Sequence, residues 1–227
     1  MRSMPVAVLA AAGSLVFTAP AWAETPAALV EDLNGRPVGV EFMDYVAAGK
    51  VIRLGPRDTI VLGYLRSCWR ETITGGVVTV GVDQSEVLNG KVERTQVKCD
   101  GGRMQLTSEQ SVQSAGVISR AIPSRSANAQ AARAEPVRLF GRIPYVEVKG
   151  GGTLQVERID QPGERFEIAI ANQDLVRGSF YDFIRARRVL TAGGTYRARF
   201  GDKQVVFAVD PSATAAAPLL ARLLRFN

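Results

Sequence analysis

The stretch that decides the fold is Val51–Leu106, which reads VIRLGPRDTIVLGYLRSCWRETITGGVVTVGVDQSEVLNGKVERTQVKCDGGRMQL. It holds the only two cysteines of the chain, Cys68 and Cys99. Short runs of β-branched and other apolar residues alternate in it with turns built from Gly, Asp, Pro and Asn. Runs this short, with turns at intervals of roughly eight to twelve residues, are typical of β-sandwiches, rolls or barrels and not of βαβ units. We therefore expect an all-β fold.

The strands expected in this stretch are bounded by turn residues, with Gly-Pro-Arg-Asp at 55–58 and Thr-Gly-Gly at 74–76 acting as chain reversals. Residues 91–99 alternate in character, and we expect Glu93, Thr95, Val97 and Cys99 to face the core. The expected strands are Val51–Leu54, Thr59–Leu65, Cys68–Ile73, Val77–Val82 and Lys91–Cys99.

The first twenty-three residues have the pattern of an export signal. Arg2 supplies a basic start, Val6–Phe17 an apolar centre, and Ala21-Trp22-Ala23 a small-x-small cleavage site. The apolar run is too short to span a bilayer comfortably. We expect cleavage after Ala23, which gives a periplasmic or secreted mature chain without a transmembrane segment.

An exported chain with two cysteines is expected to contain one disulfide, because the periplasm is oxidising. Cys68 and Cys99 would close a loop of about 31 residues, for which chain-entropy estimates give roughly 3–4 kcal/mol of stabilisation. A redox role would need closer spacing, such as C-x-x-C. The pair is therefore interpreted as a structural staple.

Residues 47–87 resemble the periplasmic FecR-type β domain. The matching features are Gly49-Lys50-Val51-Ile52, the apolar strand Ile60-Val61-Leu62, the turn Gly75-Gly76-Val77 and the run from Gly81 to Ser85. The cysteines depart from the usual pattern, and the transmembrane helix of the anti-sigma regulators is absent. The resemblance implies a periplasmic interaction role, and it does not carry over the signalling role of those regulators.

The remaining chain suggests a two-domain organisation. A first domain at 24–107 opens with a hairpin around Asn34-Gly35, and residues 108–135, rich in Ser, Ala, Gln and Arg, form an expected flexible linker. A second small β-sandwich is expected at 136–227. The opening hairpin of the first domain is expected to consist of the strands Ala28–Leu33 and Val38–Met43. The second domain is expected to contain a meander of Tyr145–Lys149, Thr153–Ile159 and Arg165–Ala171, one or two helical turns in Gly178–Leu190, a hairpin of Thr195–Phe200 and Gln204–Val209, and a short basic helix in Pro218–Phe226.

The expected C-terminal helix has two possible docking surfaces. Its leucines can dock on its own domain, which amphipathic patterning favours, or on a partner or membrane surface.

The chain contains no histidine, which excludes Ser-His-Asp and Cys-His catalysis and histidine metal sites. No glycine-rich run has the Gly-Lys-Ser/Thr context of a phosphate loop. We therefore expect a protein that is not an enzyme, with no cofactor or metal. A hydrolase that uses two carboxylates is the alternative left open, since no histidine is needed for it.

One local cluster mixes aromatic residues with arginines, a combination that is enriched at protein interfaces. The alternative, which we favour, is that the rings fill the second core and the arginines are solvated, because aromatic residues make up only 7% of the chain. The cluster comprises Phe180, Tyr181, Phe183, Arg185, Arg187 and Arg188.

The net charge of +6 comes from the second half of the chain. Residues 24–107 carry 10 Lys+Arg against 11 Asp+Glu, whereas residues 136–227 carry 14 against 9. Export argues against nucleic acid as a partner. The expected partner is another envelope protein, with an anionic envelope polymer as the alternative.

Overall fold

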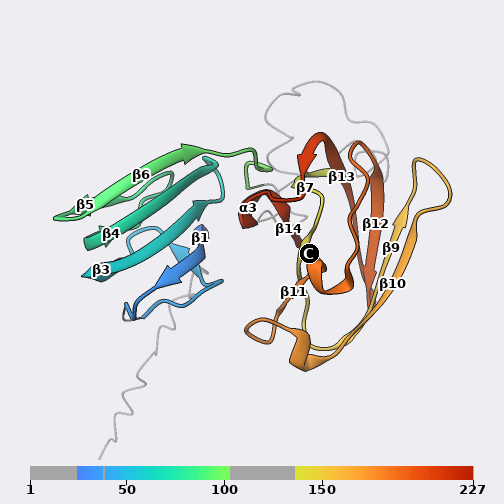
Figure 1. Cartoon of the computed structure of the whole chain (residues 1–227), viewed down its shortest axis with the longest axis horizontal. Coiled ribbons are helices and arrows are strands. Elements are labelled where there is room, and N and C mark those ends of the chain that lie inside the picture. Colours follow the sequence, from blue (N-terminus) through green and yellow to red (C-terminus); the bar gives the residue numbers. More distant parts are fainter. Residues whose placement is uncertain (1–24, 38, 103–135, 227) are drawn as a thin grey trace, which may run out of the picture.

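The computed structural model describes residues 25–37, 39–102 and 136–226 (Figure 1). These residues form two β domains, which confirms the all-β expectation. The expected signal peptide and the expected linker at 108–135 lie outside the described residues. Among the helices that the structure describes, none has the length and apolar character needed to cross a membrane.

The N-terminal domain is one antiparallel six-stranded sheet in the order β2-β1-β3-β4-β5, with β6 also paired to β4. Its core includes Ile52, Ile60, Leu62, Tyr64 and Ile73, all fully buried. The strands are β1 (Pro26–Asn34), β2 (Tyr45–Ala47), β3 (Val51–Tyr64), β4 (Trp69–Thr79), β5 (Glu86–Leu88) and β6 (Lys91–Gln96).

Two expected chain reversals are bulges inside long strands. β3 continues through residues 55–58 and β4 through Gly75-Gly76, so the four short strands expected there are two long ones. The register places Leu54 opposite Gly76 and Thr59 opposite Thr74, which leaves 55–58 as the extra residues. Gly75 and Gly76 have φ of 65° and 83°, so these glycines bend a paired ribbon and do not reverse the chain.

The expected opening hairpin has the wrong second strand. The strand that pairs with β1 is β2 at Tyr45–Ala47, which follows the expected strand Val38–Met43 in the chain. Met43 has a left-handed backbone with φ of 67°, and its N–H donates to Val30 O, so the chain turns before it re-enters the sheet.

The expected inward face of β6 is also wrong. Val92 lies opposite Ile73 and Arg94 opposite the buried Glu71, so these two side chains share a face with the core residues of β4, and Glu93 lies on the other face. The buried carboxylate on β4 decides the register, because it requires a cationic partner. Val97 and Cys99 are partly buried, but they follow the end of the strand.

The C-terminal domain is a sandwich of a five-stranded and a three-stranded sheet, in the orders β10-β9-β12-β13-β7 and β11-β8-β14. Its core draws on both sheets, for example Val146, Leu154, Phe183, Tyr196 and Phe207. The strands are β7 (Val137–Gly141), β8 (Tyr145–Glu147), β9 (Gly152–Arg158), β10 (Arg165–Ile170), β11 (Phe180–Asp182), β12 (Thr195–Phe200), β13 (Lys203–Thr214) and β14 (Leu223–Arg225).

The expected β12–β13 hairpin is confirmed. Of the three strands expected to form a meander, only the second and third pair with each other. β9 and β10 pair, but β8 belongs to the other sheet. The Gly150-Gly151-Gly152 segment therefore carries the chain between the two layers.

Of the two expected helical segments, only the C-terminal one is shorter than predicted. In residues 178–190, β11 is followed by a single 3₁₀ helix, η5 (Phe183–Ala186), which agrees with the one or two helical turns expected there. At the C-terminus, α3 spans only Leu219–Arg222, and the chain then becomes strand β14, parallel to β8. Leu220, Leu223 and Leu224 are buried as expected, and Leu219 is partly buried. Strand β8 offers backbone hydrogen bonds to β14 that a longer helix would forgo.

The two domains pack against each other through an apolar cluster (Figure 1). Leu29, Met43 and Leu65 of the first domain meet residues of the second, including Phe180 and Leu220. Polar contacts surround this cluster. They are Tyr45 Oη to Glu147 Oε2 at 2.9 Å, Arg177 with Asp44 at 3.1 Å and with Glu41, Lys98 Nζ to Ser212 Oγ at 2.7 Å, and the Arg225 guanidinium over the Tyr45 ring.

Glu31 joins the domains at the centre of this interface. It is the extra residue of a bulge in β1, since Val30 pairs with Leu62 and Asp32 with Val61. The buried carboxylate accepts hydrogen bonds from Arg70 Nε at 2.7 Å and from the backbone N–H of Leu220 at 2.6 Å. The bulge therefore aims a charged group from the first domain at the N-terminus of α3 in the second.

We expect Glu31→Ala to loosen this junction. Loss of a hydrogen bond to a charged acceptor removes about 1.5–3 kcal/mol, so amide exchange at Leu220 should accelerate about tenfold or more. Exchange measured by mass spectrometry or NMR checks this. Asp32→Ala, at the exposed neighbouring position, should leave exchange at Leu220 unchanged. Unchanged exchange in Glu31→Ala would contradict the assignment.

Candidate functional site: an arginine loop on the C-terminal domain

The aromatic and arginine cluster identified from the sequence divides into two groups. Phe180, Tyr181 and Phe183 are buried, with Phe180 in the domain interface and the other two in the second core. Arg185, Arg187 and Arg188 are exposed. The rings thus hold the segment in place, and only the arginines are available to a partner. Sequence reasoning missed two exposed aliphatic residues beside them, Ile184 and Val189.

We call residues 184–189 the arginine loop. Ile184 and Val189 are 61% and 43% exposed, whereas Phe183 and Leu190 on either side are fully buried. In the sequence, Ile184 directly follows the buried Phe183, and Val189 directly precedes the buried Leu190. Two adjacent apolar residues are too short a pattern to predict which of them faces the core and which faces solvent. Exposed aliphatic side chains that are grouped and bordered by charged residues mark interaction surfaces more often than single exposed aliphatic side chains do.

The backbone of the arginine loop is fixed at both ends. Asp182 caps η5 by accepting the N–H of Ile184 at 3.1 Å, and Arg187 ends it in a left-handed conformation with φ of 51°. Leu190 then exchanges hydrogen bonds with Arg142, whose backbone O accepts the Leu190 N–H at 2.9 Å and whose Nε donates to Leu190 O at 2.8 Å. The exposed side chains are therefore presented by an ordered backbone.

The three guanidinium groups differ in their contacts. Arg185 lies 3.6 Å from the Asp174 carboxylate, and Arg188 stacks over the Phe166 ring at 5.4 Å from its centroid. Arg187 has no ion pair among the described residues. A site with this composition can bind carboxylates of a partner while its aliphatic groups are removed from water.

A second polar group is buried inside the first domain and is fully partnered. Glu71 is 0% exposed; it accepts Arg94 Nε at 2.6 Å and the Ser85 N–H at 3.1 Å. The Ser85 hydroxyl shares a 2.8 Å hydrogen bond with Tyr64 Oη. Burial raises the pKa of Tyr64 to about 12, so this phenol stays neutral at physiological pH. The arrangement stabilises the fold and offers no free nucleophile.

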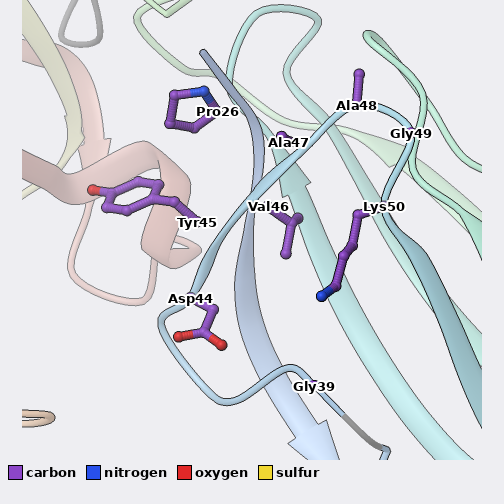
Figure 2. A pocket seen from close by; sticks show the side chains of 9 residues that line it. All are labelled: Pro26, Gly39, Asp44, Tyr45, Val46, Ala47, Ala48, Gly49 and Lys50. Carbon is purple, nitrogen blue, oxygen red and sulfur yellow. The ribbon is translucent and has the colours of Figure 1, made fainter. Parts of the chain in front are cut away.

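An open pocket of about 550 Å³ lies along β2, the edge strand of the first sheet (Figure 2). Asp44 and Lys50 contribute its charged side chains, one from each side of the strand. The pKa of Asp44 is raised above its usual value, because the effect of burial is larger than the opposing effect of the Lys50 charge. Asp44 is already paired with Arg177. A single engaged carboxylate does not make the pair of acids that glycoside hydrolysis needs.

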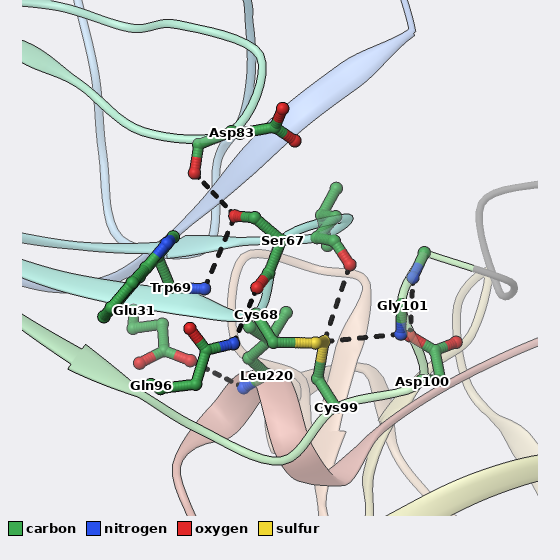
Figure 3. The surroundings of a disulfide bond; sticks show 12 residues. Glu31, Ser67, Cys68, Trp69, Asp83, Gln96, Cys99, Asp100, Gly101 and Leu220 are labelled. Carbon is green, nitrogen blue, oxygen red and sulfur yellow. Dashed lines mark hydrogen bonds between the residues drawn. A yellow bond between two sulfur atoms is a disulfide. The ribbon is translucent and has the colours of Figure 1, made fainter.

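The Cys68–Cys99 disulfide expected from the sequence is formed (Figure 3). It lies close to the domain interface, where Cys99 and Val97 pack against the apolar cluster and Figure 3 places Leu220 beside the sulfurs. Cys68 itself has a left-handed backbone with φ of 59°. The bond therefore holds the segment that follows β6 against the surface on which the second domain rests.

Within the described ranges, no cluster of three or more His, Cys, Asp or Glu residues is placed to hold a metal ion. Comparison with known proteins found no matching family model, no matching curated protein and no matching solved structure. The functional argument therefore depends on the geometry of the chain itself.

Proposed function

We propose that this chain is a non-catalytic binding protein of the bacterial envelope, in which the arginine loop docks on an acidic patch of another envelope protein. The observation that carries the proposal is the pairing of Ile184 and Val189, exposed at 61% and 43%, with three guanidinium groups on a fixed backbone. Periplasmic location rests on the export signal read from the sequence, and the disulfide agrees with an oxidising compartment. The FecR-like stretch supports an accessory or sensory role.

The composition of the loop favours a protein partner. Arginine is enriched at interfaces because its planar group binds carboxylates bidentately, and aliphatic side chains contribute when they leave water. A fixed backbone lowers the entropy lost on binding. Packing of the two domains around Glu31 further restricts the motion of the C-terminal domain, which carries the arginine loop.

The alternative partner, an anionic polymer, is less well supported. A polymer site needs a continuous cationic surface. The outer face of the five-stranded sheet carries Arg165 and Arg197, but Glu157 lies between them and Glu167 follows on β10. The charges there alternate in sign, so the field is weak.

A photoreactive residue at position 184 tests the proposal. Expressed at native level in the producing cell, Ile184 replaced by such a residue should give a reproducible covalent adduct with one envelope protein. The control is the same residue at Leu88, which is 66% exposed on the other domain and should give no such adduct. Equal adducts from both positions, or none from 184, would contradict the proposal.

Arg187→Asn should weaken binding to that captured partner at least tenfold, the equivalent of about 1.4 kcal/mol. Asparagine tolerates the left-handed backbone of Arg187, so the loop should keep its shape while it loses a guanidinium. The affinity is measured by calorimetry with the purified partner. The melting temperature should not change, because the side chain is exposed.

A further inference from the structure

Among the residues that the structure describes, the outer edge of β10 is a free sheet edge, on the far side of the C-terminal domain (Figure 1). Within these residues, β10 ends the order β10-β9-β12-β13-β7 and pairs only with β9. The opposite edge, β7, is covered by α3 and the residues before it, since a side chain at Gly141 would collide with Arg222 and Ala217. Free edges of this length are templates for another strand.

The hydrogen-bond pattern shows which groups of β10 face outward. Arg158 N–H donates to the directly opposed Glu164 O at 2.8 Å, so the bonded pairs with β9 continue at Phe166 and Ile168. The backbone groups of Arg165, Glu167 and Ala169 therefore point away from the sheet. The edge closes at Ala171, whose N–H donates to Asp174 Oδ2 at 3.1 Å.

The side chains of these outward residues continue a row of alternating charge. Arg165 lies opposite Glu157, which lies opposite Arg197 on β12. One pleat further along, Glu167 lies opposite Gln155. A strand added beside β10 forms favourable cross-strand charge pairs only if it places an acidic group opposite Arg165 and a basic group opposite Glu167.

We propose that this strand is β10 of a second copy of the chain, added antiparallel so that Arg165 of each copy faces Glu167 of the other. This pairing is self-complementary about Phe166, as a two-fold axis requires. It forms about four backbone hydrogen bonds between the outward groups. It also extends the apolar inner face formed by Phe166, Ile168 and Ile170. The inference is independent of the arginine loop.

The neighbouring register is disfavoured by the same charges. Shifting the second copy by one bonded pair sets Glu167 opposite its own counterpart, and like charges directly opposed are destabilising. A shift in the opposite direction sets Arg165 opposite its own counterpart, so the sequence RFEIAI favours the register centred on Phe166 over both of its neighbours. A dimer of this size belongs to the weak, concentration-dependent class of interfaces.

Sedimentation velocity of the purified protein tests the proposal over a range from about 1 μM to about 500 μM, which brackets weak association. We expect reversible dimer formation. Arg165→Glu and Glu167→Arg should each weaken it at least tenfold, because two attractive pairs become repulsive. An equimolar mixture of the two variants should restore a dimer, since acidic edges then face basic ones. Arg199→Glu, on the same outer face of the central strand β12, is the control.

Glu167→Pro, compared with Glu167→Gln, separates backbone pairing from charge, because both variants remove the same carboxylate. The Glu167 N–H points outward, so proline there removes no bond to β9 but removes a bond to the added strand that glutamine keeps. Dimer loss with an unchanged circular dichroism spectrum supports the pairing. A single monomeric species at all concentrations, a dimer insensitive to Arg165→Glu, or a variant mixture that stays monomeric overturns it.

Discussion

Replacing Glu71 by alanine is expected to lower the free energy of unfolding by about 3–5 kcal/mol, because it leaves buried partners without their acceptor. Glu71 is fully buried and serves both Arg94 and the Ser85 N–H. Arg94 would lose its ion pair at a side chain that is only 33% exposed. Urea denaturation followed by circular dichroism measures the loss.

The matched control for Glu71 is Glu93→Ala. Glu93 is exposed on the neighbouring strand β6, where its only ion-pair partner in the described residues is Lys91. This variant should unfold at the same urea concentration as the parent protein. Glu71→Gln should fall between the two, since an amide oxygen can still accept from Ser85. Equal stability of Glu71→Ala and the parent would show that Arg94 and Ser85 find other partners.

The second large effect is expected from loss of the disulfide. Cys68→Ser with Cys99→Ser should remove roughly 3–4 kcal/mol, as the chain-entropy estimate for a loop of this length gives. Because 1 kcal/mol shifts a small domain by about 4–8 °C, the melting temperature should fall by more than about 10 °C. Differential scanning calorimetry provides this measurement, and reducing the parent protein should reproduce it.

The position of the bond adds a more specific expectation. Val97 N–H donates to Cys68 O at 3.0 Å, and Cys99 packs against the interface cluster, so the loss should also speed amide exchange at the domain junction around Leu220. Exchange within β9 and β12, at the far side of the second domain, should stay unchanged at low denaturant. Two alkylatable thiols in unreduced native protein would refute the staple.

Much of the fold was predictable because the information is local. Alternating apolar residues and glycine turns indicated β-structure throughout, and the β12–β13 hairpin follows from two such runs around Gly201-Asp202-Lys203. The pairing of Cys68 with Cys99 was predictable because the chain has no other cysteine. Where prediction failed, the deciding contact was distant. Gly75-Gly76 has the composition of a turn, but pairing with β3 makes it a bulge.

The candidate site was predictable only in part. Composition drew attention to residues 180–188, yet burial alone separates Phe183 from Ile184, since both are large apolar residues and only one meets the core. Glu31 gave no signal, because its role depends on a bulge in β1 and on Leu220, 189 positions away. The free edge of β10 likewise depends on strand order, which no local pattern encodes.

By itself, the sequence determined the β-rich class, the disulfide and the absence of histidine chemistry, because these follow from residue types and short-range alternation. Only the tertiary structure decided which strands are continuous, which arginines face solvent and how the domains join. The physical reason is that strand register, burial and the pairing of buried charges such as Glu31 and Glu71 are set by contacts between residues far apart in the chain.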